Sequence, residues 1–142
     1  MSNAHNTAAD SGTVSAFKDP RNGRLSSIAG SPFPDHQMAP CWVEITRDGQ
    51  FLFTVNTASG SVSSFRIAPD GALSLLGSTP ISGTKVGAVD ARLSPDGGFL
   101  YVDESATGQV AAFTVSDGSL TELSTSPFAL PAGAAPAGIV VS

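Results

Sequence analysis

The sequence predicts an all-β fold, and three observations support this prediction. Short segments that alternate apolar and polar residues recur along the chain, as expected for half-buried strands. They repeat with a period of 48 residues, which places Val14, Val62 and Val110 at the same point of successive copies. Asp-Gly pairs separate the segments, and Gly accepts the positive φ of a tight hairpin. Four short strands in each repeat of about 40–50 residues are typical of β-propeller blades.

One complete copy of the repeat predicts four strands. Alternation places Cys41, Val43 and Ile45 on one face of the first strand. Asp-Gly pairs at 48–49 and 70–71 predict the tight turns that connect antiparallel neighbours. The predicted strands are Cys41–Thr46, Phe51–Asn56, Ser61–Ile67 and Ala72–Gly77.

The repeat also predicts how the chain is organised. We expect an arc of about three four-stranded antiparallel blades, whereas a closed ring needs about 4–8. The chain is therefore either a piece of a longer propeller or a protomer that completes its ring by self-association, and the incomplete first copy favours a piece. The expected segments are a flexible start over 1–12, a half blade over 13–28, blades over 40–77 and 88–124, and an inner strand over 137–142.

The first residues have two interpretations. Met1-Ser2-Asn3-Ala4 is either the remnant of an expression tag or the end of a strand that precedes the half blade. In the second case Asn3 matches Asn56, provided that the first copy carries an insertion of five residues.

The composition excludes several classes of function. Of the 142 residues only 13% are charged, and 12 acidic against 7 basic residues give a net charge of −5. Such a surface repels phosphate backbones, so we expect no nucleic-acid partner. No apolar stretch approaches the ~20 residues of a membrane-spanning helix. A single cysteine excludes an internal disulfide and any multi-cysteine metal site. We expect no metal and no organic cofactor.

Four residues are the candidates for a functional site. Glu44 and Arg92 lie 48 residues apart on the predicted innermost strands of adjacent blades, so they should meet beside the central channel. An acid beside a guanidinium either orients a carboxylated substrate or forms a structural ion pair. Asp90 shares the repeat position of Trp42 and is expected to join them. His36 lies in a loop between blades, either as a ligand contact or simply solvated.

Two further residues have a structural and a functional interpretation. Cys41 is either a nucleophile partnered by His36 or, because Val89 and Ala137 are its repeat equivalents, a small core residue. Trp42 either stacks on a sugar ring or packs between blades. The aligned aromatic residues expected to wedge the core are Phe17, Phe65 and Phe113.

These motifs together resemble a known family. Phe53-Thr54-Val55-Asn56 and Tyr101-Val102-Asp103-Glu104, each followed by Gly-x-Val-x-x-Phe, resemble the YVTN-type repeat. Ser31-Pro32-Phe33-Pro34 and Pro40-Cys41-Trp42-Val43 are similar to segments of the bacterial lactonase-family seven-bladed propellers. That group includes 6-phosphogluconolactonase and proteins described as 3-carboxymuconate cyclase.

The resemblance implies hydrolysis or formation of a sugar-acid or muconate-type lactone at the channel mouth, without a metal or cofactor. Enzymes of this group carry a histidine near the start of an inner strand. Here those positions hold Cys41 and Trp42, Val89 and Asp90, and Ala137 and Gly138, so none of them is a histidine. The alternatives are a non-catalytic propeller that binds protein or glycan ligands, and an inactive fragment. The compartment stays open between the cytoplasm and export from a bacterial cell.

Overall fold

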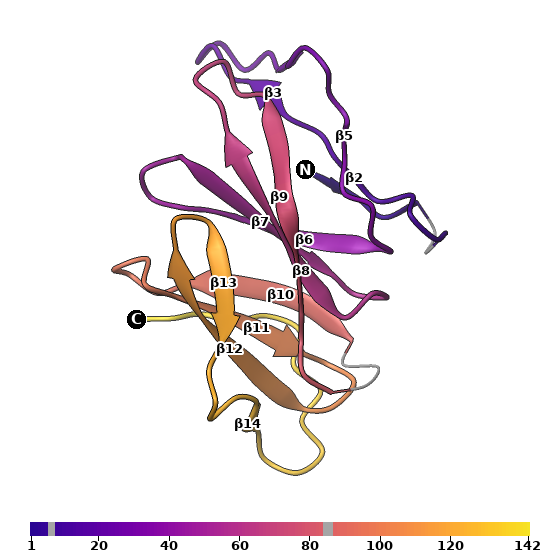
Figure 1. Cartoon of the computed structure of the whole chain (residues 1–142), viewed down its shortest axis with the longest axis vertical. Helices are drawn as coiled ribbons and strands as arrows, with labels where there is room; N and C mark the ends of the chain where they lie inside the picture. Colours follow the sequence, from indigo (N-terminus) through magenta and orange to yellow (C-terminus); the bar gives the residue numbers. More distant parts are fainter. Residues whose placement is uncertain (6–7, 84–86) are drawn as a thin grey trace.

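Antiparallel sheets build the entire described structure, which confirms the predicted all-β class and its partial-propeller architecture. The structure is a computed structural model and describes residues 1–5, 8–83 and 87–142. The sheets follow one another along the chain, with the N-terminal elements at the top of Figure 1 and the orange third sheet at the bottom. No helix among the described residues is long and apolar enough to cross a membrane.

The second blade is a four-stranded sheet in the order β6-β7-β8-β9. Its strands are β6 (Pro40–Ile45), β7 (Phe51–Asn56), β8 (Ser61–Ile67) and β9 (Leu73–Pro80). The middle two have the predicted bounds, whereas β9 extends three residues beyond the predicted end at Gly77. A register shift between Ser64 and Phe65 leaves Leu76 as the extra residue of a bulge in β9, and β9 stays paired with β8 beyond it as far as Pro80.

The third blade repeats this arrangement. Its strands are β10 (Ala88–Leu93), β11 (Phe99–Glu104), β12 (Gln109–Ser116), β13 (Ser119–Glu122) and the short β14 (Phe128–Ala129), which pairs with the start of β12. The inner strands correspond residue for residue, because the same register shift follows Pro40 in β6 and Ala88 in β10. Side chains 48 residues apart therefore leave the two inner strands in equivalent directions.

The first blade is shorter and is split into two small sheets. Its strands are β1 (Ser2–Asn3), β2 (Thr13–Val14), β3 (Phe17–Lys18), β4 (Ser26–Ser27) and β5 (Phe33–Pro34), in the orders β1-β2-β5 and β3-β4. The stretch 1–12, expected as a flexible start, thus contains a paired strand. Asn3 faces Thr13 as Asn56 faces Ser61, so Asn3 does match Asn56.

The C-terminal residues differ from the expected inner strand over 137–142. Residues 137–142 form no strand, although the backbone N–H of Ile139 donates to Asp90 Oδ2 at 3.0 Å. A strand needs a ladder partner, and in both full blades the inner strand pairs with the strand that follows it. The described residues include no strand that pairs with residues 137–141.

Two apolar clusters hold the blades together. The cluster between the first and second blades contains Val14, Leu52, Phe65 and Leu73. The larger cluster between the second and third blades includes Phe53, Val55, Val62, Ile81, Leu100, Ala111 and Phe113. Each cluster excludes water from two sheets at once, so burial between blades is the main force that fixes their relative positions.

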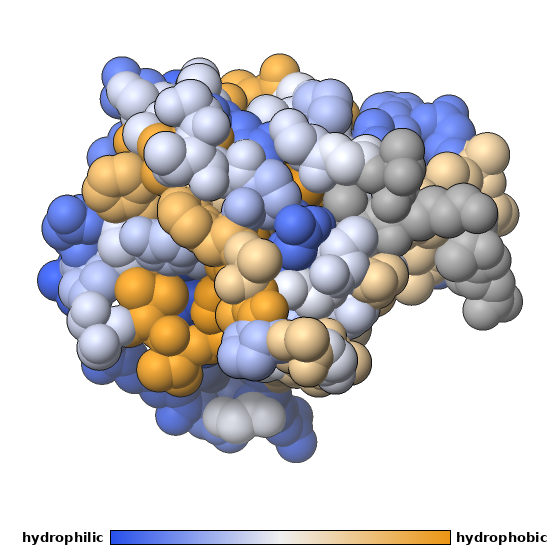
Figure 2. Space-filling model, turned by 90° about the horizontal axis from the view of Figure 1, so that it is seen from below, coloured by the Kyte–Doolittle hydropathy of each residue, from blue (hydrophilic) through white to orange (hydrophobic). Residues whose placement is uncertain are grey.

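One predicted core wedge is wrong. Phe65 and Phe113 are fully buried, but Phe17 is 43% exposed. Phe65 and Phe113 each face a leucine on a neighbouring strand, Leu52 and Leu100, whereas Phe17 pairs only with Ser27 at the edge of a hairpin. Seen from below, the surface is mainly hydrophilic to neutral, with separate hydrophobic patches (Figure 2).

Candidate functional site

Glu44 and Arg92 form an ion pair between adjacent blades. Glu44 lies on β6 and Arg92 on β10, and Arg92 Nη1 is 3.1 Å from Glu44 Oε1. The 48-residue spacing predicted this contact, because equivalent positions on neighbouring inner strands face each other. The side chain of Glu44 is 13% exposed and that of Arg92 is 45% exposed, so the guanidinium keeps donors free for a ligand.

The surroundings of Glu44 favour its protonated form. Burial raises the pKa of its carboxyl, and the charge of Asp90 raises it further. The charge of Arg92 and hydrogen bonds from Trp42 and the Leu93 backbone partly oppose this increase in pKa. A carboxyl with a raised pKa, beside a half-exposed guanidinium, has the properties of a general base next to an anion-binding group.

Asp90 acts on this pair through its charge and does not join the ion pair. Its side chain is buried, with Oδ1 accepting from the Ala91 N–H at 2.7 Å and Oδ2 from the Ile139 N–H at 3.0 Å. The strand register places it opposite Asp103 of β11. Asp90 was expected to join Glu44 and Arg92, but it makes no ion pair with them and only its charge affects Glu44, whose pKa it raises.

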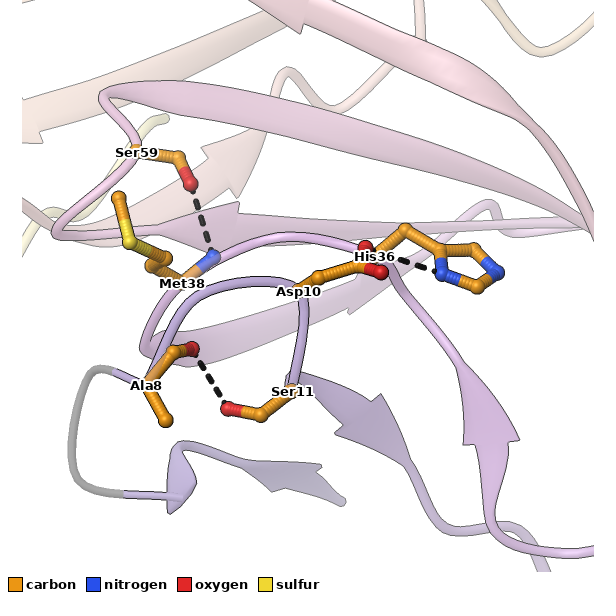
Figure 3. A network of polar contacts seen from close by, with 6 residues as sticks. All are labelled: Ala8, Asp10, Ser11, His36, Met38 and Ser59. Atoms are coloured by element: carbon orange, nitrogen blue, oxygen red, sulfur yellow. Dashed lines mark hydrogen bonds and ion pairs between the residues drawn. The ribbon is translucent and has the colours of Figure 1, made fainter.

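His36 lies in a separate polar network. Its Nδ1 is 3.1 Å from Asp10 Oδ1, and both side chains are exposed (Figure 3). Nearby, the Met38 N–H donates to Ser59 Oγ at 2.8 Å, and this hydrogen bond joins the loop to the second blade. His36 is thus occupied with a loop contact, and no contact links it to Glu44 or Arg92 among the described residues.

Cys41 is exposed, which corrects its interpretation as a core residue. The register shift between Pro40 and Trp42 leaves Cys41 without a partner in β7. Trp42 is partly exposed on the same strand. The exposed thiol of Cys41 and the partly exposed indole of Trp42 are therefore consecutive on the inner strand β6.

The turn acids lie around a pocket that the sequence did not indicate. A cavity of about 270 Å³ is lined by residues that include Thr46, Arg47, Asp48, Asp96 and Asp117. Hydroxyl groups and turn backbone N–H groups bond Asp48 and Asp96 and lower the pKa of both carboxyls. The carboxylates of Asp48 and Asp96 therefore accept hydrogen bonds within their own turns. In the described part of the chain, no group of three or more His, Cys, Asp or Glu side chains could hold a metal ion.

The buried acids of β11 were also missed by the sequence reasoning. Asp103 is fully enclosed, and neither of its carboxylate oxygens has a hydrogen bond of standard geometry. The available signal was a break in the repeat, because Asp103 and Glu104 stand where the preceding copy has Val55 and Asn56.

The comparisons with known proteins agree on one architecture. The family model described as lactonase, 7-bladed β-propeller, matches residues 3–136. A protein from Lactobacillus plantarum is 25% identical with a TM-score of 0.72, and the match covers 90% of this chain and 42% of that one. The periplasmic gluconolactonase of Pseudomonas aeruginosa is 24% identical with a TM-score of 0.68, over 93% of this chain and 39% of that one.

A third solved structure belongs to the same group. It is a protein from Bacteroides uniformis described as a candidate 6-phosphogluconolactonase, 24% identical with a TM-score of 0.67, over 82% of this chain and 34% of that one. This chain therefore spans about a third to two fifths of the length of these three structures. No curated protein matches it significantly.

Proposed function

Because this chain belongs to the lactonase family of seven-bladed β-propellers, we propose that it is part of a propeller that opens the lactone ring of a sugar acid at the channel mouth. The observation that supports the proposal most directly is the Glu44–Arg92 pair, which joins two inner strands and leaves the guanidinium half exposed. A sugar-acid lactone is the first substrate to test, because two of the similar structures are described as a gluconolactonase and a candidate 6-phosphogluconolactonase.

The proposed chemistry uses the two side chains in different roles. The Glu44 carboxylate accepts a proton from a water molecule as the water oxygen bonds to the lactone carbonyl carbon. The Arg92 guanidinium stabilises the negative charge that develops on the carbonyl oxygen. Collapse of the tetrahedral intermediate breaks the bond to the ring oxygen, which takes the proton back from Glu44. The raised pKa of Glu44 brings its proton affinity closer to that needed for this transfer near neutral pH.

A non-catalytic binding propeller is the second candidate. It is favoured by the inner strands themselves, because neither β6 nor β10 contains a histidine and the partly exposed Trp42 offers an aromatic surface for a sugar ring. In this case the Arg92 guanidinium binds the carboxylate of a ligand, and the ligand dissociates without a chemical change.

Rates of lactone hydrolysis separate the two candidates. We expect the purified chain to hydrolyse glucono-δ-lactone or 6-phosphogluconolactone faster than buffer alone, measured as acid release at constant pH. Arg92→Ala should reduce this rate about 100-fold, the usual effect of removing an oxyanion donor, and Glu44→Gln should reduce it to a similar extent. Arg66→Ala is the matched control, because Arg66 stacks over the Phe51 ring, 4.8 Å from its centroid. Saturable binding of gluconate without any hydrolysis would favour the binding propeller instead.

A further inference from the structure

Asp90 and Asp103 form a buried pair of carboxyl groups in the third blade. They face each other across β10 and β11, and their residues are 6% and 1% exposed. Asp90 accepts two backbone hydrogen bonds, from Ala91 and Ile139, whereas neither oxygen of Asp103 has a hydrogen bond of standard geometry, although the Gly138 backbone lowers its pKa. Directly opposed side chains on antiparallel strands lie within contact distance, so the two groups share one small, dry environment.

No basic side chain compensates this pair. The elements packed against it are β6, β7 and β12 together with residues 137–141, of which β7, β12 and 137–141 carry no charged side chain. Arg92 of β10 pairs with Glu44 of β6 and therefore does not neutralise Asp90. The remaining charged or titratable groups on these elements and on β10 and β11 are Glu44, Arg92, Tyr101 and Glu104, with Cys41 on β6.

Ionising both of two adjacent buried carboxyl groups is unfavourable, so one proton is retained to a higher pH than in an isolated acid. Asp90 already accepts two backbone hydrogen bonds, so the proton is assigned to Asp103, the acid that has no hydrogen bond of standard geometry. Its environment agrees, because burial and the charge of Asp90 raise the pKa of Asp103, and the Gly138 backbone opposes this only in part.

The fold itself does not require this pair. Trp42 and Val55 occupy the same two positions of the second blade, where an indole and an aliphatic side chain complete an otherwise equivalent sheet. Asp90 has instead a contact that Trp42 lacks, because its Oδ2 holds the backbone N–H of Ile139 in the segment 137–141.

We propose that Asp90 and Asp103 form a single proton-binding site that latches residues 137–141 onto the third blade. With the proton bound, Asp103 donates to Asp90, and Asp90 keeps its hydrogen bond from Ile139. Loss of the proton places two negative charges side by side, and their repulsion drives Asp90 away from the Ile139 N–H. The latch closes at low pH and opens as the pH rises, independently of the proposed lactone chemistry.

Amide hydrogen exchange at Ile139 tests the latch. Exchange is followed by NMR on the full chain from pH 5 to 9 in EDTA and corrected for the intrinsic pH dependence of exchange. We expect the protection of Ile139 to fall about tenfold as Asp103 ionises, the effect of roughly one unit of pKa coupling. The carboxyl carbon shift of Asp103 should change over the same pH range.

Variants separate the latch from general stability. Asp103→Asn keeps a neutral donor and should protect Ile139 at every pH. Asp90→Ala, which removes both acceptor oxygens, should remove the protection at every pH. Asp103→Val, which copies Val55 of the second blade, provides a second uncharged variant if the amide fails to fold. Glu104→Gln, at the neighbouring buried acid, should leave the pH dependence unchanged.

Three results would overturn the proposal. The first is protection of Ile139 that does not change with pH. The second is an Asp103→Asn variant with the same pH dependence as the parent chain. The third is protection restored at pH 9 by calcium in place of EDTA, because that result would make the pair a cation site.

Discussion

Asn3 and Asn56 make the same two hydrogen bonds in successive blades. Asn3 Nδ2 donates to Thr13 Oγ1 and Ser15 Oγ, both at 2.9 Å, and Asn56 Nδ2 donates to Ser61 Oγ at 3.1 Å and Ser63 Oγ at 2.9 Å. They lie 53 residues apart, five more than the repeat, so the insertion between β1 and β2 leaves this contact intact. An amide that ties the end of one strand to the start of the next, buried at Asn56 and half-buried at Asn3, is thus part of the blade itself.

Replacing Asn56 should therefore destabilise the chain strongly. Asn56→Ala removes both donors and leaves two buried hydroxyls less well satisfied, which should lower the free energy of unfolding by about 2 kcal/mol. Urea denaturation measures the change. Asn22→Ala, in an exposed turn, is the control and should cost well under half as much. Equal losses would mean that the amide contact does not stabilise the blade.

Aligned phenylalanines should differ in their contribution to stability. Phe65→Ala empties a fully buried site and should cost about 3–5 kcal/mol. Phe17→Ala, at the same repeat position but 43% exposed, should cost about 1 kcal/mol or less in this 142-residue chain. Thermal and urea unfolding of both variants provide the comparison. A cost for Phe17→Ala close to that of Phe65→Ala would show that Phe17 is buried in solution.

Alanine substitutions at two glycines of Asp-Gly turns should distinguish the cost of backbone strain from the cost of a steric clash. Gly49 and Gly118 have φ of 72° and 78°, so alanine is strained at both. A Cβ on Gly49 meets nothing, whereas one on Gly118 collides with the ring of Phe51. Gly49→Ala should cost about 1 kcal/mol, and Gly118→Ala about 2 kcal/mol more because the second blade must shift. Similar unfolding free energies for the two variants would contradict the close approach of the blades at Gly118.

Asp35 occupies a place that the next blade fills with an apolar side chain. The Asp35 N–H donates to Gly12 O at 2.8 Å, as the Ile81 N–H donates to Gly60 O at 2.9 Å. Asp35 is fully buried, and neither of its carboxylate oxygens has a hydrogen bond of standard geometry. Burial raises the pKa of this carboxyl, and the Ser63 hydroxyl and the charge of His36 oppose the increase in part.

Removing the Asp35 charge should stabilise the chain at neutral pH. The folded-state pKa lies above the unfolded value, so the folded state binds this proton more tightly and stability falls as the pH rises through the folded pKa. Asp35→Asn should gain about 1 kcal/mol at pH 7 and show no such gain at a pH below both values. Unfolding at several pH values measures this, with Asp19→Asn as an exposed control. A loss at pH 7 would mean that a bound partner stabilises the carboxylate.

The Glu44–Arg92 pair should contribute little to stability. Because Arg92 is 45% exposed, water screens the interaction, and a double-mutant cycle with Glu44→Gln and Arg92→Gln should give a coupling below about 1 kcal/mol. The coupling should shrink further in about 1 M salt. A coupling of several kcal/mol would favour a structural role for the pair over a ligand-binding role.

Period and alternation were sufficient to predict the blades. Strands β7 and β8 have their predicted bounds, and Glu44 meets Arg92 as the 48-residue spacing requires. These features depend on local pleat, turn geometry and repetition, all of which are visible in the order of residues. The extension of β9 was not predictable, because its bulge depends on pairing with β8 and leaves no distinctive residue pattern.

The exposure of a side chain and the groups that it contacts, by contrast, depend on which elements lie nearby. Phe17, Phe65 and Phe113 are the same residue at the same repeat position, yet only the last two have a strand that covers them. Asp90 and Asp103 lie 13 residues apart, and only the hairpin between β10 and β11 sets their carboxyl groups against each other. The repeat specifies where a side chain points, whereas its exposure and its proton affinity come from neighbours brought in by long-range packing.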